Sequence, residues 1–177
     1  DPRVSRTLPV WLGAFEDLGI RPAFVFMYRN PAEVAASLLK RNGLNPTVGQ
    51  LVWLRYVLDA EYHSRGLTRS LVYYPDLVSD WRSAADRLGE ALGVVWPNMS
   101  ANAQMEADGF LSPQLRHHDS RSKDTISQID ARSVPWVAET YALLADREGL
   151  EAAPAQARLD QIRTQFGEAS RNLFRVY

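Results

Sequence analysis

The pattern of apolar residues predicts helices and strands that alternate along the first half of the chain. Apolar side chains recur at helical spacing from Thr7 to Leu18, with Thr7 as the expected N-cap and Pro9 in the first turn. The continuous apolar run 23–28 predicts a strand buried on both faces, and the run 70–74 predicts a second strand. Because strand-then-helix order favours parallel pairing, we expect an α/β fold in which helices flank a parallel sheet.

Further helices account for most of the remaining chain. The segment Asn30-Pro31-Ala32-Glu33 predicts an N-cap, a proline in the first turn and a capping box, which begin a helix that ends near Arg41. A turn is expected at Pro75-Asp76. Apolar spacing predicts additional helices at 47–64, at 134–147 and at 155–174, and the turn at Pro75-Asp76 should lead into another helix. The helix at 47–64 should bury Leu51, Leu54, Leu58 and Tyr62. The helix that follows Pro75-Asp76 should bury Trp81, Ala84, Leu88 and Leu92. Irregular segments are expected at 42–46, 94–102 and 110–130.

Two strands are few for a parallel sheet, which usually has several strands and helices on both faces. The chain begins with Asp1 rather than with Met. Either further strands lie in the segments expected to be irregular, or the rest of the sheet lies in a segment that precedes Asp1, which is the interpretation we favour. The whole chain, 1–177, is expected to be one incomplete domain, with an α/β part at 1–93 and a loop-rich, helical part at 94–177.

Composition narrows the classes of partner. The 177 residues are 46% hydrophobic, enough for one domain with a core, and the net charge is −1. No global positive field attracts nucleic acid or an anionic membrane, and no apolar run has membrane-spanning length, so neither partner is expected. The absence of cysteine excludes disulfides and thiolate metal sites and is compatible with the cytoplasm, which is the expected location. Any bound anion must occupy a local site.

The end of the first predicted strand carries residues suited to such a site. A helix that begins at Asn30 offers free backbone N–H groups and the positive end of its dipole to a phosphate. Arg29 adds a planar fork of donors, and the hydroxyl of Ser37 follows about two turns later on the same face. Open α/β sheets bind ligands at the carboxyl ends of their strands. The alternative is that Arg29 is a solvated strand-end residue and Ser37 an ordinary surface serine.

Three segments resemble those of sulfotransferases that use 3′-phosphoadenosine 5′-phosphosulfate as donor. Residues 28–38 resemble the motif in which an Arg and a Ser eight positions apart hold the donor's 3′-phosphate, and Arg29 and Ser37 have that spacing. The opening Asp1-Pro2-Arg3 is similar to the Lys-Asp-Pro-Arg segment of bacterial members. Residues 72–77 are similar to their Tyr-Glu-Asp-Leu segment, with Pro75 in place of Glu.

The resemblance implies a P-loop nucleoside-kinase-like fold and transfer of a sulfuryl group to a hydroxyl of a carbohydrate or another small molecule. Arg29 and Ser37 would bind the donor. Residues 110–118 resemble a basic segment late in bacterial members, where Arg116 or His117 could contact an anion, with a solvated loop as the alternative. In the complete protein Asp1 and Arg3 would lie at the active edge after a strand and could contact substrate or donor, with a frayed terminus as the alternative.

Catalysis needs elements that this sequence does not contain. The family holds the 5′-phosphosulfate in a Gly/Ser/Thr-rich loop, and the sequence has no such loop and no identifiable general base. Activity is therefore expected only if the full-length chain supplies both. The alternative is a catalytically inactive nucleotide-binding or helical interaction module.

Other polar and aromatic residues favour no second chemistry. The adjacent His117 and His118 lack a helical i, i+4 partner, so a solvated loop is expected there and no metal site. The tryptophans are expected mainly in the core rather than against an adenine. The final amphipathic helix could pack on its own domain or serve a homo-oligomer interface.

Overall fold

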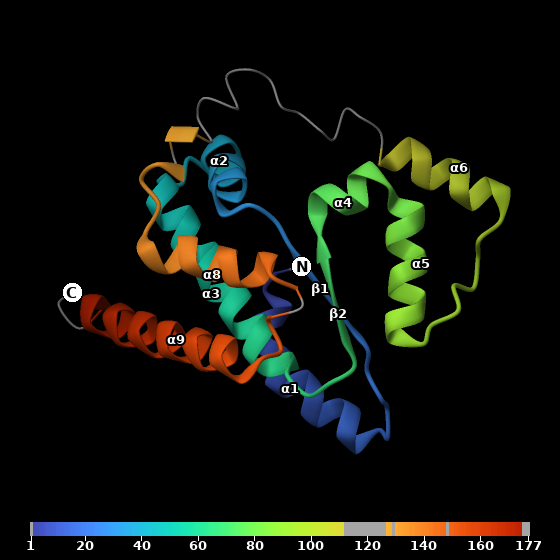
Figure 1. Cartoon of the computed structure of the whole chain (residues 1–177), viewed down its shortest axis with the longest axis horizontal. Coiled ribbons are helices and arrows are strands. Elements are labelled where there is room, and N and C mark those ends of the chain that lie inside the picture. Colours follow the sequence, from blue (N-terminus) through green and yellow to red (C-terminus); the bar gives the residue numbers. More distant parts are fainter. Residues whose placement is uncertain (1, 112–126, 129, 148, 175–177) are drawn as a thin grey trace. The chain divides into compact units, whose positions relative to one another are not determined.

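The computed structural model describes residues 2–111, 127–128, 130–147 and 149–174, and the side chains of residues 172–174 are not described. The chain divides into two compact units, each assembled from segments that lie apart in the sequence. The first unit contains Asp1–Leu8, Asn30–His63 and Ile126–Tyr177, and the second contains Pro9–Arg29 and Ser64–Thr125. Helices predominate in both, and the strands belong to the second unit (Figure 1).

The sheet of the second unit confirms the predicted parallel pairing. Strand β1 (Phe24–Tyr28) lies beside β2 (Arg69–Tyr73), and Tyr28 is opposite Tyr73 in the register (Figure 1). These two strands form the sheet in the described residues. The prediction that β1 is buried on both faces is wrong, because Val25 and Met27 are 45% and 46% exposed while Phe26 is buried. Successive strand side chains point to opposite faces, and the described residues cover only one face of β1.

Helices follow β2 directly. Helix α4 (Tyr74–Ser79) begins where a turn was predicted, because Pro75 is tolerated in a first helical turn. Helix α5 (Trp81–Leu92) begins at Asp80, whose side chain accepts a hydrogen bond from the backbone N–H of Ser83, and ends at Gly93 with φ of 64°. Ala84 and Leu88 are buried as predicted, but Trp81 and Leu92 are only partly buried.

Helix α6 (Ala101–Phe110) was not predicted, since the segment around it was interpreted as irregular. It has no buried residue, and therefore no apolar periodicity that reveals it in the sequence. Asp108 attaches it to α5: Asp108 accepts two hydrogen bonds from the Arg82 guanidinium, at 2.8 and 2.7 Å, and one from the Trp81 indole at 2.8 Å.

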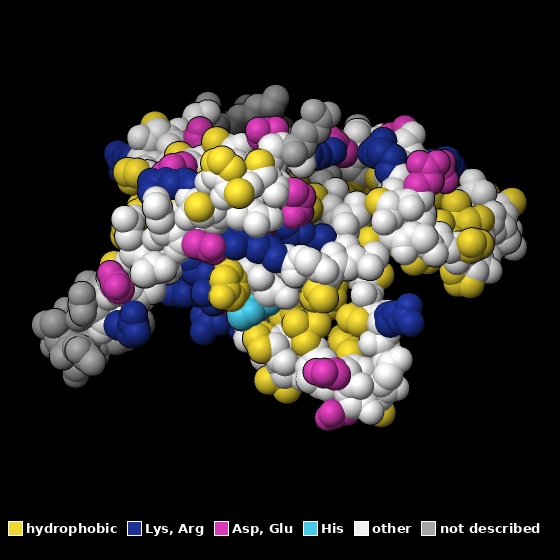
Figure 2. Space-filling model, turned by 60° about the horizontal axis from the view of Figure 1, so that its bottom comes forward, with side chains coloured by type: hydrophobic (Ala, Val, Ile, Leu, Met, Phe, Trp, Pro, Cys, Tyr) yellow, Lys and Arg dark blue, Asp and Glu magenta, His cyan; other side chains and the backbone are white. Residues whose placement is uncertain are grey.

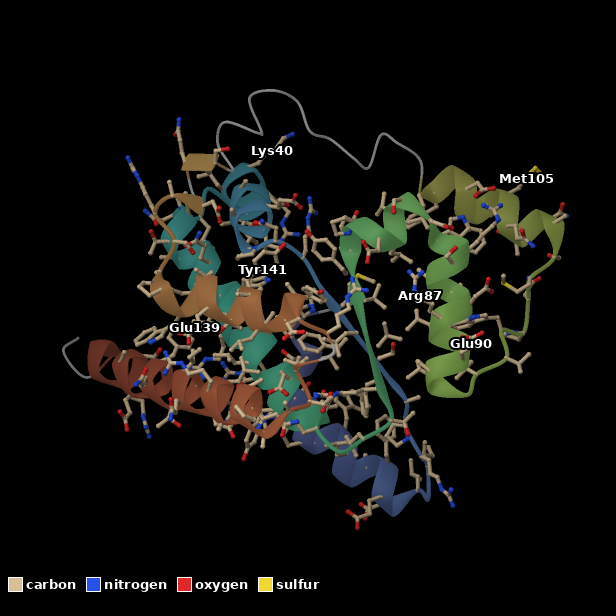
Figure 3. All side chains as sticks on the ribbon, viewed as in Figure 1. Lys40, Arg87, Glu90, Met105, Glu139 and Tyr141 are labelled. Carbon is tan, nitrogen blue, oxygen red and sulfur yellow. The ribbon has the colours of Figure 1, made fainter. Side chains whose placement is uncertain are left out.

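The first unit is a group of helices: α2 (Pro31–Asn42), α3 (Pro46–Ser64), α8 (Pro135–Ala145) and α9 (Ala153–Phe174). The long apolar side chains that are most deeply buried come from α3, α8, α9 and the link between the last two: Leu54, Leu58, Leu144, Leu150, Leu159 and Ile162. Glu139 of α8 points toward α9, where Arg158 donates two hydrogen bonds to its carboxylate (Figure 3).

The predicted burial along α3 is only partly correct. Leu54 and Leu58 are buried, but Leu51 is half-buried and Tyr62 is 43% exposed. Side chains on several faces of this helix are buried instead, among them Gln50, Trp53, Val57, Asp59 and Glu61. A single apolar stripe is a poor guide to such a helix, because the burial extends beyond one face.

Helix α1 (Val4–Asp17) begins three residues before the predicted N-cap. The backbone N–H groups of Ser5 and Arg6 donate to the carbonyls of Pro2 and Arg3, which closes the first turn earlier than expected. The Thr7 hydroxyl donates to the Val4 carbonyl at 3.3 Å, so Thr7 lies inside the helix and does not cap it. Pro9 is also inside the helix, where it lacks the N–H that an interior residue normally donates.

Candidate functional site

The junction between β1 and α2 has the predicted cap. The side-chain oxygen of Asn30 accepts hydrogen bonds from the backbone N–H groups of Ala32 at 2.8 Å and Glu33 at 3.3 Å. Pro31 occupies the first turn, where a missing N–H costs nothing. Asn30 therefore caps the first turn of α2, and Arg29 lies between β1 and this cap in the sequence.

The cap also changes which groups are available to a ligand. Two N–H groups of the first turn of α2 already donate to Asn30. An anion at this helix end would have to compete for them, so its main contacts should come from side chains rather than from the backbone.

Arg29 is half-buried and contacts an aromatic ring at the end of the neighbouring strand. Its guanidinium carbon lies 4.8 Å from the centroid of the Tyr74 ring, within the range of a cation–π contact. The rings of Tyr28 and Tyr73 lie beside each other, with centroids 5.2 Å apart. The carboxyl ends of both strands therefore carry an aromatic group with Arg29 next to it.

Tyr74 was not predicted as a member of this group. Parallel pairing with Tyr28 opposite Tyr73 determines its place, because the residue after each strand end is then brought to the same edge of the sheet. The two apolar runs in the sequence end in Tyr28-Arg29 and Tyr73-Tyr74. Only the strand register shows that Arg29 and Tyr74 occupy equivalent positions at the ends of the two strands.

Ser37 lies on the exposed side of α2. The opposite side of the helix buries Ala32 and Ala35, both at 0% exposure. At Gly49 of α3 an added Cβ would lie 3.1 Å from the Cα of Ala35, so the two helices pack closely there. This packing determines which face of α2 carries Ser37 to the solvent.

The structure describes these candidates in separate units. Arg29 ends a segment of the second unit, and Ser37 belongs to the first, so their convergence on one ligand stays a prediction. Arg3 is exposed, and its carbonyl accepts a hydrogen bond from the Arg6 N–H at 3.1 Å. Asp1, Arg116 and His117 lie outside the described residues.

The described residues contain no group of three or more His, Cys, Asp and Glu side chains that could hold a metal ion. Within the same residues, no helix has both the length and the apolar character needed to cross a membrane.

The tryptophans differ in burial. Trp53 is buried and lies edge-on to Tyr141, whereas Trp11 is 51% exposed, contrary to the inward packing expected of its helix face.

Comparisons with protein-family models, with curated proteins and with solved structures found no match to this chain. The functional interpretation therefore depends on the residues and their surroundings.

Proposed function

We propose that this chain binds the 3′-phosphate of 3′-phosphoadenosine 5′-phosphosulfate through Arg29 and Ser37, and that it serves transfer of the sulfuryl group to a hydroxyl of a sugar or small metabolite. The observation that carries the proposal is the order at the end of β1: a strand in a parallel sheet, then Arg29, then a capped helix with Ser37 on its exposed face. The proposal includes a P-loop nucleoside-kinase-like fold, of which the small parallel sheet and its helices are the matching elements.

The surroundings of Arg29 favour a phosphate ligand over simple hydration. A guanidinium presents several N–H donors in a plane and pairs with two phosphate oxygens at once. Contact with the Tyr74 ring restricts the long side chain before a ligand arrives. Less conformational entropy is then lost on binding than for an arginine that moves freely in water.

Arg29 and Ser37 would position the donor rather than perform the chemistry. The bond that breaks joins the sulfuryl group to the 5′-phosphate, whereas these residues would hold the 3′-phosphate, whose charge does not change in the reaction. They would bind the ground state and the transition state about equally, so their loss should raise KM more than it lowers kcat.

A nucleotide-binding module without catalysis is the second candidate. The observation that favours it is the lack of a Gly/Ser/Thr-rich phosphate loop in the 177 residues. Both candidates require the same 3′-phosphate contacts, so binding is tested first and catalysis second.

The binding test compares adenosine 3′,5′-bisphosphate with 5′-AMP by isothermal titration calorimetry of the 177-residue chain. We expect tighter binding of the bisphosphate, because only it carries the 3′-phosphate. Arg29→Ala should remove the preference, since a charge-assisted contact contributes about 1.5–3 kcal/mol, which is about tenfold or more in Kd. Arg87→Ala is the matched control, because Arg87 is an exposed arginine of the same unit, on α5 (Figure 3).

Equal affinity of the wild-type chain for the two nucleotides would refute the proposal and favour a helical interaction module. If the preference is present, transfer of a radiolabelled sulfuryl group by the full-length chain, from 3′-phosphoadenosine 5′-phosphosulfate to hydroxyls of a panel of sugars, separates an enzyme from a binding module.

A further inference from the structure

A buried carboxylate in the first unit bridges three helices. Asp59 of α3 has a side chain that is 6% exposed. Its Oδ2 lies 3.1 Å from Nε of Arg6 in α1, and its Oδ1 accepts a hydrogen bond from Nε of Arg163 in α9 at 3.3 Å. Each carboxylate oxygen therefore faces a different arginine.

A third arginine, Arg55, lies close to Asp59, Arg6 and Arg163. Arg55 is one helical turn before Asp59 on α3 and is half-buried, and its guanidinium carbon lies 4.5 Å from the Phe166 ring centroid. Within the described residues no carboxylate is within ion-pair distance of it. Burial lowers the pKa of Arg55, the charge of Asp59 opposes this shift, and the positive charges of Arg6 and Arg163 add to it.

The cluster therefore has an uncompensated charge. Arg6, Arg55 and Arg163 contribute three positive charges and Asp59 contributes one negative charge, which leaves an excess of two. Arginine does not lose its proton in proteins, so the repulsion is not relieved by titration. Repulsion between partly buried charges is stronger than in bulk water, and an anion that enters the cluster would relieve it.

The guanidinium groups reach solvent while the carboxylate does not. The side chains of Arg6 and Arg163 are 53% and 31% exposed, so an anion has access to them from water. Arg163 lies 4.1 Å over the Tyr62 ring, which, like Phe166 beside Arg55, restricts the position of the cation. Figure 2 shows Lys and Arg side chains that reach the surface close to a histidine.

His63 adds a polar group without adding charge at neutral pH. Burial is the main cause that lowers its pKa, and the charge of Arg163 lowers it further. The imidazole is therefore neutral near pH 7, where its N–H can still donate to an anion.

A purely structural role explains only part of this arrangement. The contacts of Asp59 with Arg6 and Arg163 hold α1, α3 and α9 together, as a buried ion pair commonly does. Arg55 makes neither contact: the charge of Asp59 favours its charged form, whereas Arg6 and Arg163 repel it.

We propose that Arg6, Arg55 and Arg163 form a binding site for an oxyanion of two or more negative charges, such as a sulfate or phosphate group. The proposal is independent of the proposed 3′-phosphate site, with which it shares no residue. The anion could be free or part of a sulfated or phosphorylated small molecule, and the experiment distinguishes these sources.

The test measures binding of inorganic sulfate to the 177-residue chain by isothermal titration calorimetry, with chloride adjusted to keep the ionic strength constant. We expect sulfate to bind and to raise the thermal midpoint, because it binds the folded state. Arg55→Gln should raise the Kd for sulfate about tenfold, since it removes one charge-assisted contact, while the Asp59 bridges stay intact. Arg55→Lys keeps the charge but not the fork and should give an intermediate Kd.

Arg171→Gln is the matched control, because it removes the same charge from an exposed position of α9, two turns beyond Arg163. Arg29→Ala should leave sulfate binding unchanged, which separates this site from the 3′-phosphate site. Glucose 6-phosphate and inorganic phosphate are compared next: tighter binding of the sugar phosphate indicates a small-molecule ligand, and equal binding indicates the free anion. The proposal is overturned if sulfate binds no better than chloride, or if both Arg55 variants bind sulfate like the wild type.

Discussion

Replacing Asp59 with Asn tests how much the buried carboxylate contributes to the stability of the first unit. The substitution keeps the shape of the side chain and removes its charge. The pair with Arg6 involves a half-exposed guanidinium, so it should contribute at most about 1 kcal/mol. The hydrogen bond from Arg163 goes to a charged, buried acceptor, which usually contributes about 1.5–3 kcal/mol, but its length of 3.3 Å favours the low end.

The expected total is a loss of about 2 kcal/mol in the free energy of unfolding, because Asn can still accept a weaker hydrogen bond from Arg163. Urea titration followed by tryptophan fluorescence measures it, and Trp53 is a buried probe on the same helix. With a typical slope of about 2 kcal/mol per M, the midpoint should fall by about 1 M urea without a change in slope.

Glu139→Gln is the matched control for this experiment. Glu139 and Arg158 form a bidentate pair in the same unit, but each side chain is 38% exposed, so the loss should stay below about 1 kcal/mol. Equal shifts of the midpoint in the two variants would show that burial of Asp59 has no energetic consequence. Sulfate provides a second check: Asp59→Asn raises the excess charge of the cluster from two to three, so added sulfate should recover more stability in the variant than in the wild type.

Two further predictions concern the second unit. Tyr74→Leu should reduce the preference for adenosine 3′,5′-bisphosphate over 5′-AMP about two- to fivefold, because Arg29 loses its ring contact, while Tyr74→Phe should retain the preference in the same calorimetric titration. Hydrogen bonds from Arg82 are the main cause that lowers the pKa of Asp108 in the folded state, so the stability from this pair is present above the pKa of the unfolded chain and is lost as the pH falls through the lower folded value. Unfolding midpoints measured between pH 6 and pH 2 should therefore fall less steeply in Asp108→Asn than in the wild type, and parallel curves would contradict this.

Local signals in the sequence determined much of the fold. The boundaries of β1 and α2 were predictable because an apolar run, an Asn cap and a proline follow one another within ten residues. The interior position of Thr7 was not predictable, since its helix begins with turn hydrogen bonds that carry no sequence pattern. Helix α6 was not predicted for a related reason: it buries no side chain, so its sequence has no periodic pattern of apolar residues.

Some residues of the candidate site were also predictable from the sequence, and others were not. Arg29 and Ser37 were visible because eight positions and one helix cap separate them, so their spacing carries geometric meaning. Tyr74 became visible only through the strand register, which pairs residues that are 45 positions apart in the chain. The arginine cluster combines residues 6, 55, 59 and 163, and no spacing rule connects them before the helices have packed.

The arginine cluster also explains how a chain of net charge −1 can concentrate positive charge. Asp59 attracts Arg6 and Arg163, but the three arginines repel one another, so a further contact must hold Arg55 beside the other two. Arg55 lies over Phe166 and Arg163 over Tyr62, and each contact keeps the apolar stem of the side chain against a ring while the guanidinium edge reaches water. Contacts with Tyr62 of α3 and Phe166 of α9 therefore hold Arg163 and Arg55 close together. The single negative charge of Asp59 does not neutralise the three arginines. The overall composition excludes a global field, but it places no limit on a local one built in this way.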